Sequence, residues 1–422
     1  MMTRKFLQRM LASQFDSYRK KHKQPLRVLK AVEAIINCRT TENGATCYHC
    51  PDQHEAIEIP HSCKHRSCPQ CAPVSQREWI EKQKQRLLPC AHYHLVFTLP
   101  HDYLTLWQYN RKWFVQAQFD VCRDVLMELM GDARYLGAQP GILMALHTWG
   151  RQLNLHPHIH CLVTAGGLMP NGEWKNVDGD YLLPIQVVKA LYRGKFQHRL
   201  KQALDKGELT LPDQDSPSTI QQLIKAQYNK PWSVRIEEKY AHGKGVLLYL
   251  SRYLKGGPIK PAQIQHMDDR EVIFRYKDHR DQRIKPLRLT SDEFIRRLLL
   301  HIPEPGLHTV RHYGLYAAQA QSKRQICREQ IAQAAGSDTP SVEEMGDKLE
   351  LKVFCRHCGA AMVAGLRRLG SRWGENSYRQ GVTPKAYVQQ GVQAAPAGRR
   401  RPERSTSETY APGNFFAVPG AA

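Results

Sequence analysis

Two pairs of cysteines limit the possible folds of this chain more than any other feature of its sequence. Cys47 and Cys50 are separated by two residues, as are Cys68 and Cys71, and the two pairs lie near each other in the chain. The thiolates of such a CxxC pair lie on one tight turn, so each pair can supply two corners of a zinc tetrahedron. The spacing therefore predicts a zinc ribbon. Because four thiolates leave no open position for water, this Zn²⁺ would stabilise structure and take no part in chemistry.

Other cysteines and histidines leave the ligand set open. Cys38 and Cys63 lie near the two pairs and could replace a predicted ligand or simply pack. A third pair, Cys355 and Cys358, has no partner pair further along the chain, so its role stays open. Four histidines in the zinc-ribbon region are more easily explained as DNA contacts or surface residues than as ligands: His49, His54, His61 and His65.

The charge of the chain indicates a polyanionic partner. Lys and Arg outnumber Asp and Glu by 61 to 39, which gives a formal net charge of +22. Nucleic acid is the first expectation for such an excess. The candidate DNA contacts are basic residues in the zinc-ribbon region or beside the tyrosines described below: Lys64, Arg66, Arg252 and Lys255.

The hydrophobic pattern predicts no contact with a membrane. No stretch approaches about 18 consecutive apolar residues, the length that a spanning helix needs. The basic, amphipathic start of the chain is typical of a helix within a domain and not of a signal peptide. We therefore expect a cytoplasmic protein, in which clustered cysteines more often bind metal than form disulfides.

Composition and periodicity predict an α+β fold in three parts. Residues 1–88 are expected to form a helical lead and a zinc-binding, DNA-recognition domain. Residues 89–320 alternate between strand-like and helical segments, with a basic helical insert at about 170–230 that we assign to DNA binding on its charge alone. Residues 321–422 have the composition of a polar, basic and largely disordered tail.

Several local patterns place elements within the central part. "HYHLVFTLP" is typical of a buried strand. "GILMALHTWG" and "HIHCLVTAGG" indicate two strands of an antiparallel hairpin. "TSDEFIRRLLLHI" predicts a helix that begins with Thr290 or Ser291 as its cap.

The stretch "LHPHIHCLV" places two histidines on one face of the second hairpin strand. Alternation points His158 and His160 one way and Ile159 the other way, toward a core. Two neighbouring imidazoles could share one divalent cation. The motif alone favours a structural pair, however, and the chain contains a rival pair, His92 and His94.

A pair of tyrosines offers a nucleophile for such a cation. Tyr249 and Tyr253 stand four residues apart on an expected helix, so their side chains would share one face. Tyrosines at this spacing usually only pack. Together with a cation that polarises a phosphodiester, however, a tyrosine could attack DNA, join its 5′-phosphate and release a 3′-hydroxyl.

At these residues the chain resembles the two-tyrosine transposases of rolling-circle insertion sequences. These enzymes are named HUH for a histidine–hydrophobic–histidine motif. The matching blocks occur in family order over roughly residues 30–320: "SCKHRSCPQC", "LHTWGRQLNLHPHIHCLVTAGGL", "VLLYLSRYLKGGPI" and "EFIRRLLLHIPEPGLHTVRHYGLYA". Several long blocks in register are far more specific than any single motif.

The resemblance implies a zinc-binding amino-terminal domain and an HUH nuclease core, with a central antiparallel sheet flanked by helices. It places the family's metal-binding pair on His158 and His160 and its nucleophiles on Tyr249 and Tyr253. The implied activity is cleavage and rejoining of single-stranded DNA at element ends and target, with Mg²⁺ or Mn²⁺, in a bacterial, nucleoid-associated setting. A third metal ligand is usual, and our candidate is His147, across the hairpin.

Two other functions fit parts of this pattern. A plasmid replication initiator or relaxase would use the same chemistry, although the zinc ribbon disfavours it. A zinc-dependent DNA-binding regulator would need neither the histidines nor the tyrosines. The chain has no helicase P-loop, so strand separation is expected to depend on a host helicase or the replication machinery.

Overall fold

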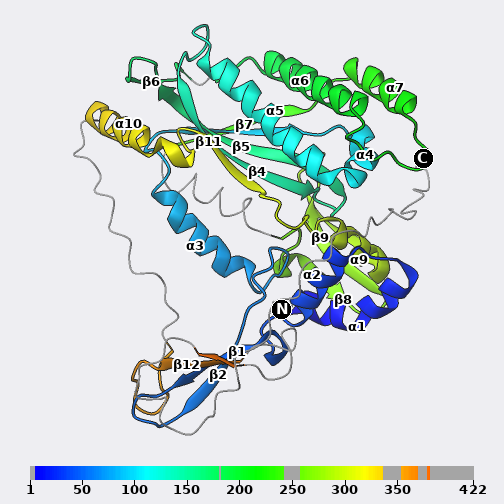
Figure 1. Cartoon of the computed structure of the whole chain (residues 1–422), viewed down its shortest axis with the longest axis vertical. Helices are drawn as coiled ribbons and strands as arrows, with labels where there is room; N and C mark the ends of the chain where they lie inside the picture. The colour runs from blue at the N-terminus through cyan, green and yellow to red at the C-terminus, as the bar shows by residue number, and fades with distance from the viewer. Residues whose placement is uncertain (1–4, 180–181, 242–256, 336–352, 369–377, 381–422) are drawn as a thin grey trace.

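The computed structural model describes residues 5–179, 182–241, 257–335, 353–368 and 378–380 (Figure 1). It is a mixed α+β structure with three antiparallel sheets. None of the helices in the described part of the chain is long and apolar enough to cross a membrane.

The largest sheet has six strands, and the predicted hairpin lies at its centre. The strand order is β11-β4-β5-β3-β7, and β6 pairs with β5. All of these pairs are antiparallel. The strands are β3 (His92–Thr98), β4 (Gln139–Trp149), β5 (Leu155–Leu168), β6 (Trp174–Asn176), β7 (Val234–Tyr240) and β11 (Val310–Gly314). The sequence therefore predicted the first strand and the hairpin correctly.

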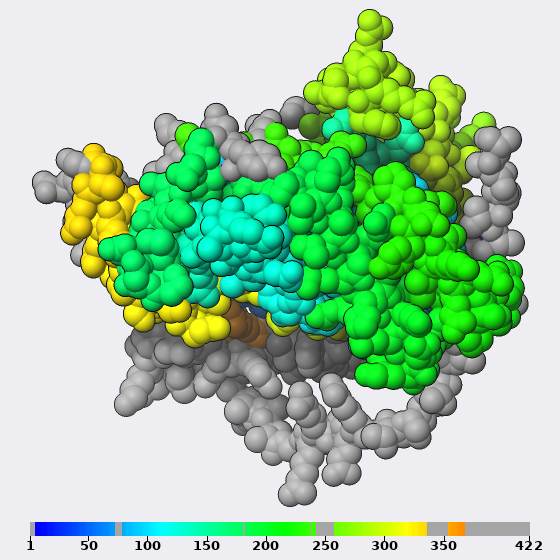
Figure 2. Space-filling view, turned by 90° about the horizontal axis from the view of Figure 1, so that it is seen from above, coloured from blue at the N-terminus to red at the C-terminus, as the bar shows by residue number. Residues whose placement is uncertain are grey.

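Helices cover one face of this sheet. Alternate residues of β5, Ile159, Cys161 and Val163, are buried in a core that includes Phe119 and Phe196 of the helices. The covering helices are α4 (Leu104–Tyr109), α5 (Arg111–Gly131), α6 (Ile185–Asp205) and α7 (Pro217–Tyr228). The predicted helical insert thus completes the helical layer, and in Figure 2 its green surface covers much of one face beside α5 in cyan.

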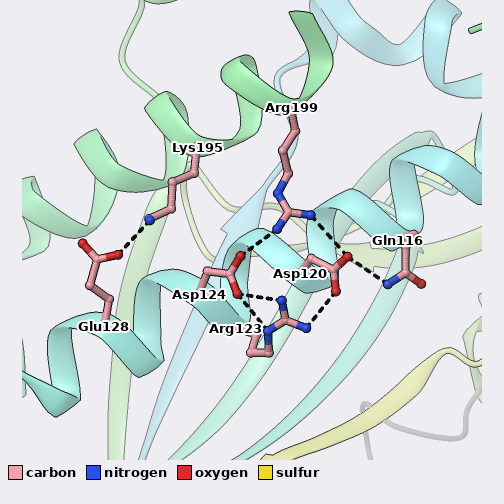
Figure 3. Close-up of polar contacts among 7 residues, drawn as sticks. All are labelled: Gln116, Asp120, Arg123, Asp124, Glu128, Lys195 and Arg199. Carbon is pink, nitrogen blue, oxygen red and sulfur yellow. Dashed lines mark hydrogen bonds and ion pairs between the residues drawn. The ribbon is translucent and has the colours of Figure 1, made fainter. Parts of the chain in front are cut away.

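Ion pairs fix α6 on α5 outside this core. Arg199 pairs with Asp120 at 3.3 Å and with Asp124 at 2.8 Å, and Lys195 pairs with Glu128 at 2.7 Å (Figure 3). Part of the positive charge on which we assigned the insert to DNA binding is therefore neutralised within the molecule.

The opposite face of the sheet carries the histidines. Leu143 and Leu162 lie in a second, smaller core with Leu315 and Tyr316, which follow β11. Alternation along β5 puts His158 and His160 on the same side as Leu162, as the sequence predicted. Two further helices are α3 (Ala72–Lys84) and α10 (Gln321–Ala334).

The amino-terminal helices do not form a core with the zinc-binding region alone. Phe6, Phe15 and Val32 share one core with Phe274 and Phe294, far along the chain. This unit contains α1 (Phe6–Lys21), α2 (Leu26–Ile36), β8 (Ile264–Met267), β9 (Glu271–Lys277), β10 (Ile284–Thr290) and α9 (Ser291–Leu300). The side chain of Thr290 accepts a hydrogen bond from the Glu293 amide, so Thr290 caps α9 as predicted. The boundary expected at residue 88 is thus crossed by a shared core.

A small four-stranded sheet is built from two segments that lie far apart in the sequence, residues 45–60 and residues 363–380. Its order is β13-β12-β1-β2, and β1 pairs with both β2 and β12. In Figure 1 it lies apart from the central sheet. The strands are β1 (Ala45–His49), β2 (Ala56–Pro60), β12 (Val363–Arg368) and β13 (Tyr378–Gln380). The region predicted as a largely disordered tail therefore contains regular structure, namely α10 and β12. The sequence did not indicate β12, because its partner strand β1 lies about 300 residues earlier in the chain.

Candidate metal centre

Three histidines on the two central strands form a compact group, which we call the histidine triad: His147, His158 and His160. His147 on β4 lies opposite His158 on β5, and Ala145 lies opposite His160, so all three imidazoles point from the same face. The distances between ring centroids are 4.6 Å for His147–His160, 4.8 Å for His158–His160 and 5.5 Å for His147–His158. One ring nitrogen from each residue lies within 4.8 Å of the others, which suits a shared cation.

Hydrogen bonds orient two of these rings. His158 Nδ1–H donates to the carbonyl oxygen of His156 at 2.6 Å, so its Nε2 carries the lone pair that a cation requires. His160 Nδ1 lies 2.9 Å from Nε2 of His94, and His94 Nδ1 lies 3.7 Å from the carboxylate of Glu237. His92 and His94 therefore do not act as a pair. His94 contacts His160, whereas His92 contacts the Tyr316 hydroxyl at 2.5 Å.

Burial favours the neutral form of two of the triad histidines, His158 and His160. Burial lowers the pKa of His158 to about 4, and burial together with the neighbouring histidines lowers the pKa of His160 well below its usual value. Burial also lowers the pKa of His94 to about 3. Because only the neutral imidazole binds a metal ion, these groups are ready as ligands at neutral pH.

An aromatic ring connects the triad to a neighbouring cavity. Trp149 stacks on His147, with ring centroids 4.6 Å apart and an interplanar angle of 16°. Trp149 also lines a small cavity with Arg66, His301 and Gly257.

The predicted nucleophiles, Tyr249 and Tyr253, lie outside the described residues, as do Arg252 and Lys255. Both described ends of that segment are close to residues that contact the triad. Tyr240, before it, has its ring centroid 6.5 Å from that of His94. Gly257, after it, lines the cavity beside Trp149.

Three of the four predicted zinc ligands lie in two separate groups of metal-binding side chains. Cys68 and Cys71 lie with Cys38 and Cys63, and all four Sγ atoms are within 4.8 Å of one another. The Cys71 Sγ lies 3.5 Å from that of Cys38 and 3.7 Å from that of Cys63. A Zn–S distance of about 2.3 Å gives tetrahedral edges of about 3.8 Å, so these four cysteines fit a structural zinc ion.

The pairing of Cys47 and Cys50 with that group is therefore wrong. The β1–β2 hairpin carries Cys50 into a different group, with His54, Cys355 and Cys358. Cys47 lies on β1 opposite Glu58 and belongs to neither group among the described residues. Spacing alone could not show this, because Cys38 approaches Cys71 only after α2 has packed.

The two described DNA-contact candidates differ in position. Lys64 is exposed, with a positive φ of 52°, on the turn that carries Cys63. Arg66 instead points inward: its guanidinium donates to the Thr309 hydroxyl and to the Leu146 carbonyl oxygen at 3.4 Å. These two acceptors hold the guanidinium against the protein, and a contact between Arg66 and DNA stays a prediction.

Comparisons with known proteins agree with this arrangement. A family model described as "Putative transposase" matches residues 141–325, which include the triad. A model described as "Transposase zinc-binding domain" matches residues 10–99, which include the four-cysteine group. Both descriptions are of DNA transposases.

Two curated relatives identify the type. The chain is 32% identical over 350 residues to the putative transposase y4qJ of Sinorhizobium fredii, which covers 79% of this chain and 87% of the relative. It is also 32% identical over 300 residues to the transposase for insertion sequence element IS801 of Pseudomonas savastanoi pv. phaseolicola. This match covers 68% of this chain and 70% of the relative. No solved structure matches the chain. The chain belongs to the two-tyrosine transposases of the IS91/IS801 type, with an amino-terminal zinc-binding transposase domain, which confirms the family predicted from the sequence.

Proposed function

We propose that this transposase moves a rolling-circle insertion sequence by cleaving and rejoining single-stranded DNA. In this proposal its central domain is an HUH endonuclease, Tyr249 and Tyr253 are the nucleophiles, and His147, His158 and His160 hold a divalent cation. The observation that carries the proposal is the buried histidine triad on the two central strands. Neutral imidazoles orient a cation without adding negative charge that would repel a phosphodiester.

The chemistry divides between the cation and the tyrosines. A bound Mg²⁺ or Mn²⁺ would polarise the scissile phosphate and offset the charge that develops on its oxygens. The hydroxyl oxygen of a tyrosine attacks phosphorus, and the bond to the 3′-oxygen breaks. The tyrosine proton is lost, and the departing oxygen takes up a proton as a 3′-hydroxyl. The 5′-phosphotyrosine bond conserves the energy needed for rejoining, and the second tyrosine can take the next strand.

The described ends of the tyrosine-bearing segment support this assignment. Tyr240 is adjacent to His94, which contacts His160, and Gly257 lies beside the cavity that Trp149 lines. The chain thus enters and leaves residues 242–256 near the triad.

The excess positive charge supports a nucleic-acid substrate. We propose that Lys64, which is exposed, contacts the DNA backbone together with Arg252 and Lys255, and that a host helicase or the replication machinery supplies the single strand. Lys195 and Arg199 pair with acidic residues on α5. Any contact between the helical insert and DNA would therefore be made by the other basic residues of the insert.

A nicking assay tests the proposal. Purified protein with Mn²⁺ or Mg²⁺ and single-stranded element ends should yield a covalent protein–DNA adduct that contains phosphotyrosine. Changing both Tyr249 and Tyr253 to Phe should abolish the adduct, whereas each single change should leave a partial product. An adduct that persists in the double variant would exclude these nucleophiles.

The triad is tested in the same assay. His158→Ala and His160→Ala should abolish cleavage and retain binding of single-stranded DNA. His156→Ala is the matched control, because it keeps the backbone carbonyl that accepts from His158 and removes an imidazole outside the triad. If His158→Ala cleaves as wild type does, the triad is not the metal site.

A further inference from the structure

A second group of metal-binding side chains lies outside the transposase zinc site and far from the triad in the sequence. Cys50 and His54 come from the β1–β2 hairpin, and Cys355 and Cys358 come from the segment before β12. The Cys50 Sγ lies 3.5 Å from the Cys358 Sγ and 3.6 Å from His54 Nδ1. One ligand atom from each of the four residues lies within 4.8 Å of the others.

The backbone around Cys355 and Cys358 has the form of a metal-binding turn. The Gly359 amide donates to the Cys355 carbonyl oxygen at 2.9 Å, and Gly359 has a φ of +72°, which favours glycine. The His357 amide donates to the Cys355 Sγ at 3.4 Å.

The hairpin presents Cys50 in a similar way. The Gln53 amide donates to the Cys50 carbonyl oxygen at 3.0 Å, and the Cys50 amide donates to the Glu55 carbonyl oxygen at 3.0 Å. A backbone amide also connects the two halves, since Arg356 N–H donates to the Glu55 carboxylate at 2.5 Å. The turn that carries Cys50 and the turn that carries Cys355 therefore lie against each other.

We propose that Cys50, His54, Cys355 and Cys358 bind a second structural zinc ion, which fastens the carboxy-terminal segment to the amino-terminal hairpin. Three thiolates and one imidazole are a common ligand set for structural zinc. The measured separations are close to the edges of about 3.8 Å that Zn–S bonds of about 2.3 Å require. The Sγ–Sγ distance of 3.5 Å is much longer than a disulfide bond of about 2.05 Å.

The size of the local core explains why this sheet needs a metal ion. Among the described residues, its buried apolar cluster consists of Cys50, Cys355 and Met362, with Tyr48, Ile57 and Val353 packed beside them. Such a small core buries too little apolar surface to offset the entropy of joining segments about 300 residues apart. A zinc ion can supply that free energy, because its binding contributes directly to folding.

The first test measures zinc in the full-length protein. Elemental analysis should find about two zinc ions per chain in wild type and about one in the Cys355→Ser/Cys358→Ser variant. Cys47→Ser is the matched control, because Cys47 lies outside both groups, and it should retain about two. Wild-type stoichiometry in the double serine variant would overturn the proposal.

The second test identifies the fourth ligand and does not depend on complete folding. After substitution with Co²⁺, His54→Cys should keep both ions and shift the visible absorption toward that of a four-thiolate site. His54→Ala should weaken retention of one ion. Loss of one ion in Cys47→Ser, with full retention in His54→Ala, would contradict the proposed ligand set.

Discussion

At the scale of single residues, the third position of the histidine triad is the sharpest question. His147 could be a metal ligand, or it could only pack against Trp149. His147→Phe separates these roles, because a phenyl ring preserves stacking but cannot bind a cation. We expect Mn²⁺ affinity to fall by more than about 100-fold, since loss of an outer-shell partner alone costs about 10–100-fold. Calorimetric titration with Mn²⁺ measures this, and unchanged affinity would assign His147 to packing.

His301 provides a pH-dependent contribution to stability. Its Nε2–H donates to the Leu153 carbonyl oxygen at 3.0 Å, and its Nδ1 accepts from the Thr148 hydroxyl at 3.1 Å, so the neutral ring is satisfied. Burial lowers its pKa to about 4. The unfolded chain, with a pKa of about 6.5, therefore binds more protons between these values.

The contribution of His301 to stability should be complete above pH 6.5 and be lost as the pH falls toward 4. Its size is on the order of 3 kcal/mol. His301→Gln can still donate to Leu153 but does not titrate, so its unfolding free energy should fall less over this window than that of wild type. Urea denaturation at several pH values measures the difference, and parallel curves would exclude the effect.

Residue patterns predicted the orientation of the histidines but not the zinc ligands. A strand has a side-chain period of two, so His158 and His160 had to share a face whatever their partners. Cys68 and Cys71 also stayed together, because a CxxC turn is local. Which further cysteines join them depends on packing between distant segments, and spacing carries no information about that.

At the scale of elements, α6 is held by its apolar face more than by its ion pairs. Phe196 is buried among Tyr103, Phe114 and Trp232, with ring centroids 5.5–6.3 Å away. Phe196→Ala should lower the free energy of unfolding by about 3–5 kcal/mol through lost contacts and a cavity. Arg199→Ala should cost only about 0–1 kcal/mol, because its ion pairs are partly exposed. Urea denaturation measures the free energy of unfolding of both variants. Equal losses would show that the ion pairs stabilise α6 as much as its apolar face does.

Elements were predictable where their signals are local. The β4–β5 hairpin, the strand β3, the helical insert and the Thr290 cap all follow from patterns within a few residues. The strand β12 does not, because the chain around it is polar and basic and the strand is stabilised by pairing with the distant β1. The tail composition therefore indicated disorder where the partner strand supplies order.

At the scale of the whole molecule, the side chain of Arg66 connects the zinc-binding region to the histidine triad. Arg66 stands between Cys63 and Cys68, and its guanidinium lies 5.8 Å from the ring centroid of Trp149. Trp149 in turn stacks on His147. The sequence could not show this connection, because it predicted separate domains and assigned Arg66 only to DNA contact.

Arg66→Lys should disturb the triad, whereas Lys64→Ala should not. Lysine lacks the planar fork that reaches the Thr309 hydroxyl and the Leu146 carbonyl oxygen together and lies over the indole. We expect Arg66→Lys to lower Mn²⁺ affinity by up to about 10-fold. Lys64→Ala is the matched control: it should weaken binding of single-stranded DNA and leave Mn²⁺ affinity unchanged. Equal Mn²⁺ affinity in both variants would mean that the zinc-binding region does not influence the triad through Arg66.

A double-mutant cycle decides whether the effect passes through the indole. If Arg66 acts on His147 through Trp149, then Arg66→Lys should change Mn²⁺ affinity much less in a Trp149→Leu background than in wild type. Additive effects would mean that Arg66 acts by another route, such as its bond to Thr309 beside β11. A non-additive result would mean that the four-cysteine group helps to support the proposed metal site at the triad, since the turn between Cys63 and Cys68 sets the position of Arg66. Loss of zinc there should then weaken Mn²⁺ binding in wild type more than in Arg66→Lys.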